Sequence, residues 1–243
     1  MRPDRRGFLL AIGAVAASLA VTGLPLPALS AGKSNGGMRI GIVGSGKVGG
    51  TLGAVWVRAG HDVMFSSRHI EHDRTLAARL GPNARAGTPR EAAAFGEVVM
   101  ISVPYGALPE VGRQLADLID GKVVIDTCNP FPWRDGEIAN WARNKGAGLA
   151  SAELLPGARL VRAFNAIGYS RMGSAHERPG RIGMPMAGDD ADAVTVASRL
   201  VRDIGFEPVP IGGLEMGKYL MPGTPLAGER PPEEIRRIAE TLD

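Results

Sequence analysis

The fold is decided at residues 38–49, which have the sequence MRIGIVGSGKVG. Residues 38–43 are a short apolar run of the kind that forms a buried parallel strand. Residues 44–49 follow at once and fit the pattern G-x-G-x-x-G, and residues 48–59 predict a helix that ends at Gly60. A strand, a glycine-rich turn and a helix in this order are typical of a dinucleotide-binding unit.

Each glycine of this turn has its own task in such a unit. Gly44 permits the tight turn, Gly46 lets the backbone approach a pyrophosphate, and Gly49 lets the helix pack on the strand. The N-terminus of the helix then faces the phosphates, where its free N–H groups favour negative charge. We therefore expect a dinucleotide here, and a glycine-rich turn with no ligand is the alternative.

The end of the second strand indicates which dinucleotide is bound. This strand, residues 62–65, is followed by Ser66, Ser67 and Arg68. Folds selective for NAD place a carboxylate here for the ribose 2′-hydroxyl, and none is present at this tip. Two hydroxyls and a guanidinium can instead donate charge-assisted hydrogen bonds to a 2′-phosphate. The residues at the end of this strand therefore predict NADP. The alternative is that Arg68 is a solvated loop residue and that Ser66 and Ser67 only end the strand.

Strands and helices continue to alternate beyond this point. Further strands are predicted at residues 97–103, 122–126, 159–165, 182–187 and 206–211, and helices at 111–119, 189–203 and 233–242. Such alternation predicts the α/β class, with a Rossmann-type, doubly wound, mostly parallel sheet and a small C-terminal extension. We expect an NADP-binding domain at residues 38–152, and strands and helices at 153–243 that complete the sheet and the acceptor site.

The first residues carry a separate signal. Residues 4–10, DRRGFLL, join a basic start to an uncharged run at 7–32, and together they resemble a twin-arginine export signal. We expect residues 1–31 to be removed as a signal peptide and the mature protein to reach the periplasm or the extracellular space without being embedded in a membrane. An uncleaved anchor is the alternative, because residues 8–24 are uncharged and nearly long enough to span a bilayer.

Composition excludes several classes of protein. Of 28 basic and 25 acidic residues, three arginines and one aspartate fall in the first six positions, which leaves the remainder at a net charge of +1. So small a charge argues against nucleic-acid binding, as does an aromatic content of 5%. The single cysteine, Cys128, and four scattered histidines offer no ligand set for a structural metal, so none is predicted.

Several motifs together resemble the NADP oxidoreductases that depend on the deazaflavin coenzyme F420, a family with a related domain in membrane ferric reductases. The resemblance covers about residues 38–220. Its motifs are IGIVGSG at 40–46, SR at 67–68, VPY at 103–105, VID at 124–126, NP at 129–130, AFN at 163–165, AGDD at 187–190 and IGF at 204–206.

The resemblance implies a place for each part of the cofactor. Residues 45–48 would cradle the pyrophosphate, and Ser67 and Arg68 would hold the 2′-phosphate. Val103 and Ala107 would line the path from adenosine to nicotinamide, and residues 165–167 would flank the nicotinamide. With the motif-based expectations, the predicted cofactor-binding residues are Gly44, Ser45, Gly46, Lys47, Val48, Gly49, Ser66, Ser67, Arg68, Val103, Ala107, Asn165, Ala166 and Ile167.

The chemistry implied is hydride transfer between NADP(H) and a small redox acceptor, with coenzyme F420 or a flavin as co-substrate. Such a transfer mainly needs alignment and exclusion of water, so no catalytic side chain is predicted. A non-catalytic NADP-binding or sensing domain is one alternative. Another is an imine reductase of the pyrroline carboxylate type, although such enzymes usually carry a long helical dimerisation domain and only about 30 residues follow Gly213. A homodimer is left open.

Overall fold

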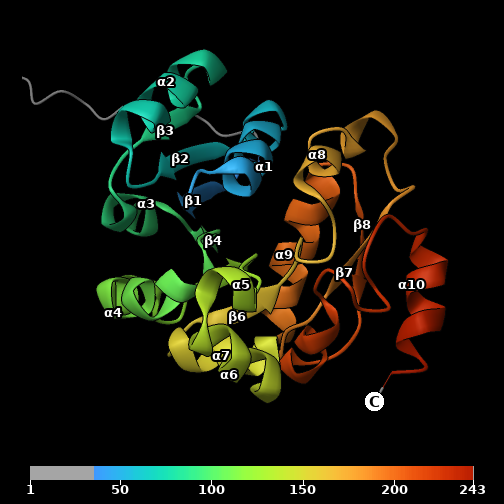
Figure 1. Ribbon diagram of the computed structural model, residues 1–243. Helices are drawn as coiled ribbons and strands as arrows, with labels where there is room; N and C mark the ends of the chain where they lie inside the picture. Colours follow the sequence, from blue (N-terminus) through green and yellow to red (C-terminus); the bar gives the residue numbers. More distant parts are fainter. Residues whose placement is uncertain (1–35, 243) are drawn as a thin grey trace, which may run out of the picture. The chain divides into compact units, whose positions relative to one another are not determined.

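The structure is a computed structural model that describes residues 36–242; the predicted signal peptide, residues 1–31, lies outside the described residues. Six parallel strands form the main sheet in the order β3-β2-β1-β4-β5-β6 (Figure 1). This is the strand order of a doubly wound dinucleotide-binding fold, which confirms the α/β, Rossmann-type prediction. The strands are β1 Arg39–Val43, β2 Asp62–Ser66, β3 Ala84–Ala86, β4 Val98–Ile101, β5 Val123–Asp126 and β6 Arg159–Arg162.

Helices cover both faces of this sheet. They are α1 Lys47–Arg58, α2 Ile70–Leu80, α3 Pro89–Phe95, α4 Leu108–Ile119, α5 Pro132–Asp135, α6 Glu137–Lys145, α7 Ala147–Leu154, α8 Tyr169–Met172, α9 Ala191–Asp203 and α10 Pro232–Ala239, with short 3₁₀ turns η1 Tyr105–Ala107, η2 Ala175–Glu177 and η3 Leu214–Tyr219. Within residues 36–242 no helix has the length and apolar character needed to cross a membrane.

The strands alternate between two apolar cores. Val98 and Met100 of β4 face a core built with α1, α2 and α9, whereas Val99 and Ile101 face a core built with α3, α4, α6 and α7. All four side chains are buried, because both faces of a parallel sheet are covered in this fold. The carboxyl ends of the strands are thereby held in fixed positions beneath their loops.

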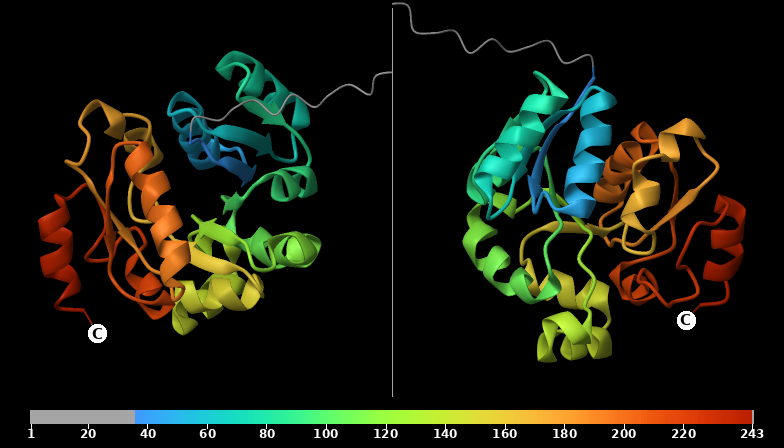
Figure 2. Two further views of the ribbon diagram at one scale, coloured as in Figure 1. Left: turned by 180° about the vertical axis from the view of Figure 1, so that it is seen from behind. Right: turned by 45° about the horizontal axis from the view of Figure 1, so that its top comes forward.

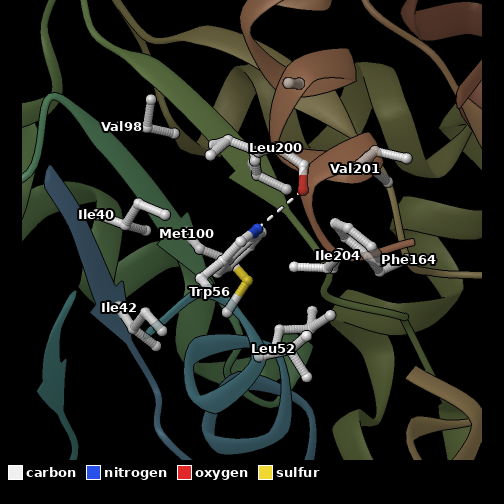
Figure 3. Packing of buried hydrophobic residues seen from close by; sticks show 14 of the residues in the cluster. Ile40, Ile42, Leu52, Trp56, Val98, Met100, Phe164, Leu200, Val201 and Ile204 are labelled. Atoms are coloured by element: carbon white, nitrogen blue, oxygen red, sulfur yellow. Dashed lines mark hydrogen bonds between the residues drawn. The ribbon is translucent and has the colours of Figure 1, made fainter. Parts of the chain in front are cut away.

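Trp56 of α1 links this helix to α9. Its ring meets Phe164 edge-on at a centroid distance of 6.0 Å. Its indole N–H donates a hydrogen bond of 2.9 Å to the carbonyl oxygen of Leu200 (Figure 3). The ring is fully buried, so the one polar atom of this side chain is satisfied where water cannot reach it.

The C-terminal strands do not extend the main sheet. β7 Gly183–Met186 and β8 Glu207–Pro210 pair in parallel as a separate two-stranded sheet, which lies between α9 and α10 (Figures 1 and 2). One antiparallel bridge, Arg162 to Ala187, links this sheet to β6. β6 thus lies in the main sheet, whereas β7 and β8 do not, which corrects the expectation that the strands of residues 153–243 complete that sheet. Pro185, Pro208 and Pro210 lack the N–H donors that a longer ladder needs.

Candidate functional site

A cavity of about 1000 Å³ opens at the carboxyl ends of β1, β2 and β4. This is the edge at which doubly wound folds bind their ligands. Its walls are the glycine-rich turn, the tip of β2, the loop after β4, the first turns of α4, and Arg134 with Asp135 of α5. Seven of the predicted residues line it: Gly44, Ser45, Gly46, Ser67, Arg68, Val103 and Ala107.

The three glycines of the turn differ in what a side chain would meet. A Cβ on Gly44, whose φ is +102°, would lie 2.2 Å from the carbonyl oxygen of Ser102, and a Cβ on Gly49 would lie 2.1 Å from that of Gly44. A Cβ on the exposed Gly46 would meet nothing within 4 Å. Packing therefore requires Gly44 and Gly49, whereas Gly46 leaves space that suits close approach of a ligand. The turn fits a dinucleotide.

The start of α1 offers donors to such a ligand. Its N-cap, Gly46, supplies no side-chain cap, and the first turn contains no acidic residue. The first N–H groups of a helix have no intrahelical acceptor, so they are available to an anion. The N–H of Ser45 is not among them, because it donates to the carbonyl oxygen of Ser66 at 3.0 Å. The free donors at this helix end are thus the N–H groups of Gly46, Lys47 and Val48, and of these three residues only Gly46 lines the cavity.

Ser66 does not reach the cavity. It is fully buried, and its hydroxyl donates a 2.6 Å hydrogen bond to the carbonyl oxygen of Ile42. That bond ties β2 to β1, so Ser66 has a structural role and its prediction as a cofactor contact is wrong. Arg68 in contrast is exposed on the cavity wall and forms no ion pair with any residue of the described range 36–242. Its guanidinium is available to a phosphate.

A buried carboxylate that the sequence did not indicate lies behind the turn. Asp73 of α2 is fully buried and accepts hydrogen bonds from two hydroxyls, that of Ser45 on Oδ1 and that of Ser67 on Oδ2. The Ser67 bond is 2.8 Å long, and the N–H of His69 donates back to Ser67 Oγ at 3.0 Å. A helix predicted over α2 would have placed Asp73 in its first turn, beside the tip of β2.

The loops after β4 and β5 are pinned to each other at the far wall. Asp135 accepts the backbone N–H of Gly106 on Oδ1 at 3.1 Å and that of Phe131 on Oδ2 at 3.0 Å. Burial alone would raise the pKa of Asp135, but these bonds and the ion pair with Arg134 outweigh it and hold the pKa below its ordinary value. The wall beside Val103 and Ala107 is therefore fixed by an ionised carboxylate.

The predicted nicotinamide wall is not brought to this cavity. Asn165, Ala166 and Ile167 follow β6, and none of the three lines the cavity. Asn165 is 3% exposed, its side-chain oxygen and nitrogen have no partner among the described residues, and it follows Phe164, whose φ is +67°. The carbonyl oxygen of Ala166 accepts a hydrogen bond from the N–H of Gly228 at 2.8 Å.

Three further predicted residues also lie outside the cavity lining. Lys47 and Val48 lie on α1, and Gly49 is buried.

Known proteins resemble this chain in sequence and in fold. Residues 39–130 match the family described as NADP oxidoreductase, coenzyme F420-dependent. The chain is 30% identical over 179 residues to Metalloreductase STEAP3 of Rattus norvegicus, covering 72% of this chain and 34% of that protein. It is 28% identical over 203 residues to the F420-dependent NADP reductase of Methanothermobacter thermautotrophicus, covering 78% of this chain and 87% of that one.

Among solved structures, a hypothetical protein from Sinorhizobium meliloti aligns with a TM-score of 0.68 at 24% identity, covering 79% of this chain and 93% of that one. The chain spans about a third of the length of the Rattus norvegicus metalloreductase and most of the length of the Methanothermobacter thermautotrophicus reductase. The matched residues 39–130 contain the glycine-rich turn, the tip of β2 and the loops that line the cavity. These matches agree with the resemblance to the coenzyme F420-dependent NADP oxidoreductases that the sequence motifs indicated, and the chain is similar to that family over residues 39–130.

Proposed function

We propose that this protein is an NADP-dependent oxidoreductase that transfers a hydride between NADP(H) and a small redox acceptor of the deazaflavin or flavin class. The observation that carries the proposal is Gly46. It stands at the uncapped start of α1, on the wall of the cavity, with no protein atom near the place of its missing side chain. A backbone position with open space beside it suits the close approach of a pyrophosphate. The match to a family of NADP oxidoreductases supports NADP(H) as the dinucleotide that carries this pyrophosphate.

The residues around Gly46 would divide the cofactor between them. The first N–H groups of α1 would hold the pyrophosphate, and Arg68 would pair with the 2′-phosphate. Val103 and Ala107 would give the remaining length an apolar wall. NADP(H) itself supplies the hydride when bound, so the chain is left with alignment and with the exclusion of water.

The class of acceptor is supported by relatedness and by size. The chain spans 87% of a relative named as an F420-dependent NADP reductase, so the proposed partner ring is a deazaflavin. Another relative, of which the chain covers about a third, is named as a metalloreductase, so a ferric chelate is the metal acceptor that the assay includes as a competitor. No metal site is needed for a ferric chelate that is reduced as a substrate.

The test is acceptor-dependent oxidation of NADPH by the purified protein. The panel contains coenzyme F420, FMN, FAD, a quinone and a ferric chelate, with NADH offered in parallel. We expect NADPH oxidation with the deazaflavin and slower or no oxidation with the ferric chelate. Binding of NADPH without oxidation by any acceptor would leave a non-catalytic NADP-binding domain as the better description.

We propose further that the protein is exported by the twin-arginine route. The support is the sequence at residues 4–10, which lies outside the described residues. Replacing Arg5 and Arg6 by lysine should hold the chain unprocessed in the cytoplasm, while the unaltered chain should appear in the exported fraction with an N-terminus near residue 32. Cell fractionation and N-terminal sequencing give the answer, and an unprocessed chain in the membrane fraction would favour an anchor.

A further inference from the structure

Asp73 stands directly behind the place where the proposed cofactor would carry its 2′-phosphate. Its carboxylate is fully buried, and the two hydroxyls bound to it, those of Ser45 and Ser67, both belong to residues on the cavity wall. The three side chains come from three different segments: the glycine-rich turn, the tip of β2 and the first turn of α2. Asp73 therefore touches the cavity only through the serines.

The hydrogen atoms at this cluster can be accounted for one by one. A serine hydroxyl has one hydrogen to donate, and an ionised carboxylate can only accept. Ser45 and Ser67 both give their hydrogens to Asp73, and Ser67 Oγ accepts a further bond from the N–H of His69 at 3.0 Å. Neither serine has a hydrogen left for a ligand. Ser45 is almost completely buried, whereas the half-buried Ser67 lines the cavity, so a ligand beside Ser67 meets a hydroxyl whose hydrogen is already held by a buried carboxylate.

We propose that Asp73 is a specificity-determining residue, which acts through Ser67 to disfavour the 2′-phosphate of NADP(H) relative to the 2′-hydroxyl of NAD(H). The inference rests on the proposed function only in that both nucleotides must bind this cavity. A ribose hydroxyl can donate to Ser67 Oγ, whereas a phosphate dianion has no hydrogen to give and meets an acceptor. To gain the Ser67 hydrogen, the phosphate must take it from a buried carboxylate, which then loses a partner.

Arg68 and Asp73 therefore act against each other at one position of the ligand. Arg68 is exposed with no ion pair among the described residues and attracts the 2′-phosphate, while Asp73 removes the donor that Ser67 would otherwise supply. The preference for NADPH over NADH is therefore smaller than it would be if Arg68 and an unpaired Ser67 hydroxyl could both donate to the 2′-phosphate. In NAD-selective folds the carboxylate contacts the ribose itself; here it is placed one side chain further back.

The test is the ratio of dissociation constants, NADH over NADPH, measured by calorimetry. Asp73→Ala frees both hydroxyl hydrogens and removes the charge, and we expect the ratio to rise about tenfold through tighter NADPH binding, since one hydrogen bond to a charged group is worth about that factor. Asp73→Asn keeps one hydroxyl bound and should give a smaller rise. Ser67→Ala alone should change the ratio little, because the hydroxyl hydrogen of Ser67 is already donated to Asp73. Combined with Asp73→Ala, it should cancel much of the increase in the ratio that Asp73→Ala produces.

Glu71→Gln is the matched control, because Glu71 is an exposed acid in the same turn of α2 that pairs with Arg74 rather than with a hydroxyl. It should leave the ratio unchanged. A ratio that stays constant or falls in both Asp73 variants would overturn the inference, as would a loss of NADPH affinity in Ser67→Ala as large as that in Arg68→Ala. If neither nucleotide binds, the proposed function fails as well; if both bind and no acceptor is reduced, only the proposed activity fails.

Discussion

Asp126 and Arg162 form an ion pair inside the sheet, with Oδ2 and Nη1 2.5 Å apart and both side chains fully buried. The two residues are register partners at the carboxyl ends of β5 and β6. Arg162 Nη1 also donates to the carbonyl oxygen of Cys128 at 3.1 Å, and the N–H of Cys128 donates to Asp126 Oδ1 at 2.7 Å. The pair thus fixes the loop after β5 against the end of β6.

Removing one member of this pair should be costly. Arg162→Met leaves Asp126 buried without its cation, and we expect the free energy of unfolding to fall by about 3–5 kcal/mol. Combining it with Asp126→Leu should recover part of that loss, because no charge is then left buried. Urea denaturation of both variants measures the effect. A loss under about 1 kcal/mol in the single variant would mean that water reaches the pair.

His61 is buried in a neutral form between the start of β1 and the end of α9. The N–H of Met38 donates to Nδ1 at 3.0 Å, so Nδ1 must be the acceptor, and Nε2 lies 3.1 Å from Asp203 Oδ2. This arrangement fixes the tautomer that carries its hydrogen on Nε2. Burial lowers the pKa of His61 from its ordinary value of 6.5, and the carboxylate of Asp203 only partly offsets that.

The protein should lose stability in acid because of His61. The unfolded chain takes up a proton at about pH 6.5, while the folded chain does so only at lower pH, so the unfolded state is favoured as the pH falls below about 6.5. The contribution of neutral His61 to the free energy of unfolding is fully present at pH 8. Thermal melting across this range should show a weaker dependence in His61→Gln and an unchanged one in His176→Gln, which alters an exposed histidine. Identical profiles for the wild type and His61→Gln would contradict this.

The sequence was informative where backbone geometry imposes a residue type. Residues 38–59 predict β1, the turn and α1 to within one residue at each end, because a buried strand needs an apolar run and the turn needs its glycines. Gly44, Gly46, Arg68, Val103 and Ala107 were likewise placed on the ligand-binding edge, and the cavity is lined by them. The positions of these residues depend on the local path of the backbone, and the pattern of apolar residues and glycines in the sequence indicates that path.

Buried polar residues left no such pattern. Ser66 and Ser67 are neighbours of the same type, yet one donates into the backbone of β1 and the other into Asp73, and only the packing of α2 against the turn decides which. Asp73 itself belongs to a helix with a weak apolar stripe that was not predicted. Pairing of β7 and β8 apart from the main sheet also depends on contacts far apart in sequence.

Two glycines of the turn should separate ligand binding from folding. Gly46→Ala places a methyl group in open space, so stability should change by less than about 1 kcal/mol while affinity for NADPH and NADH falls equally. Gly49→Ala places its methyl group against the carbonyl oxygen of Gly44 and should lower stability by about 1–3 kcal/mol. Denaturation and calorimetry on the same samples compare the two. Equal effects of both changes on stability would mean that Gly46 is also a packing glycine.

Arg68 should carry most of the attraction to the 2′-phosphate. Because the hydrogen of Ser67 is held by Asp73, Arg68 is the donor at the tip of β2 that has no competing partner among the described residues. Arg68→Ala should weaken NADPH binding by about tenfold or more, the worth of a charge-assisted pair, and should leave NADH binding nearly unchanged. Arg79→Ala removes an exposed arginine from the end of α2 and controls for net charge. The NADPH loss should also shrink at high salt, because exposed charges are screened; an equal loss for both nucleotides would place Arg68 against a part of the cofactor that they share.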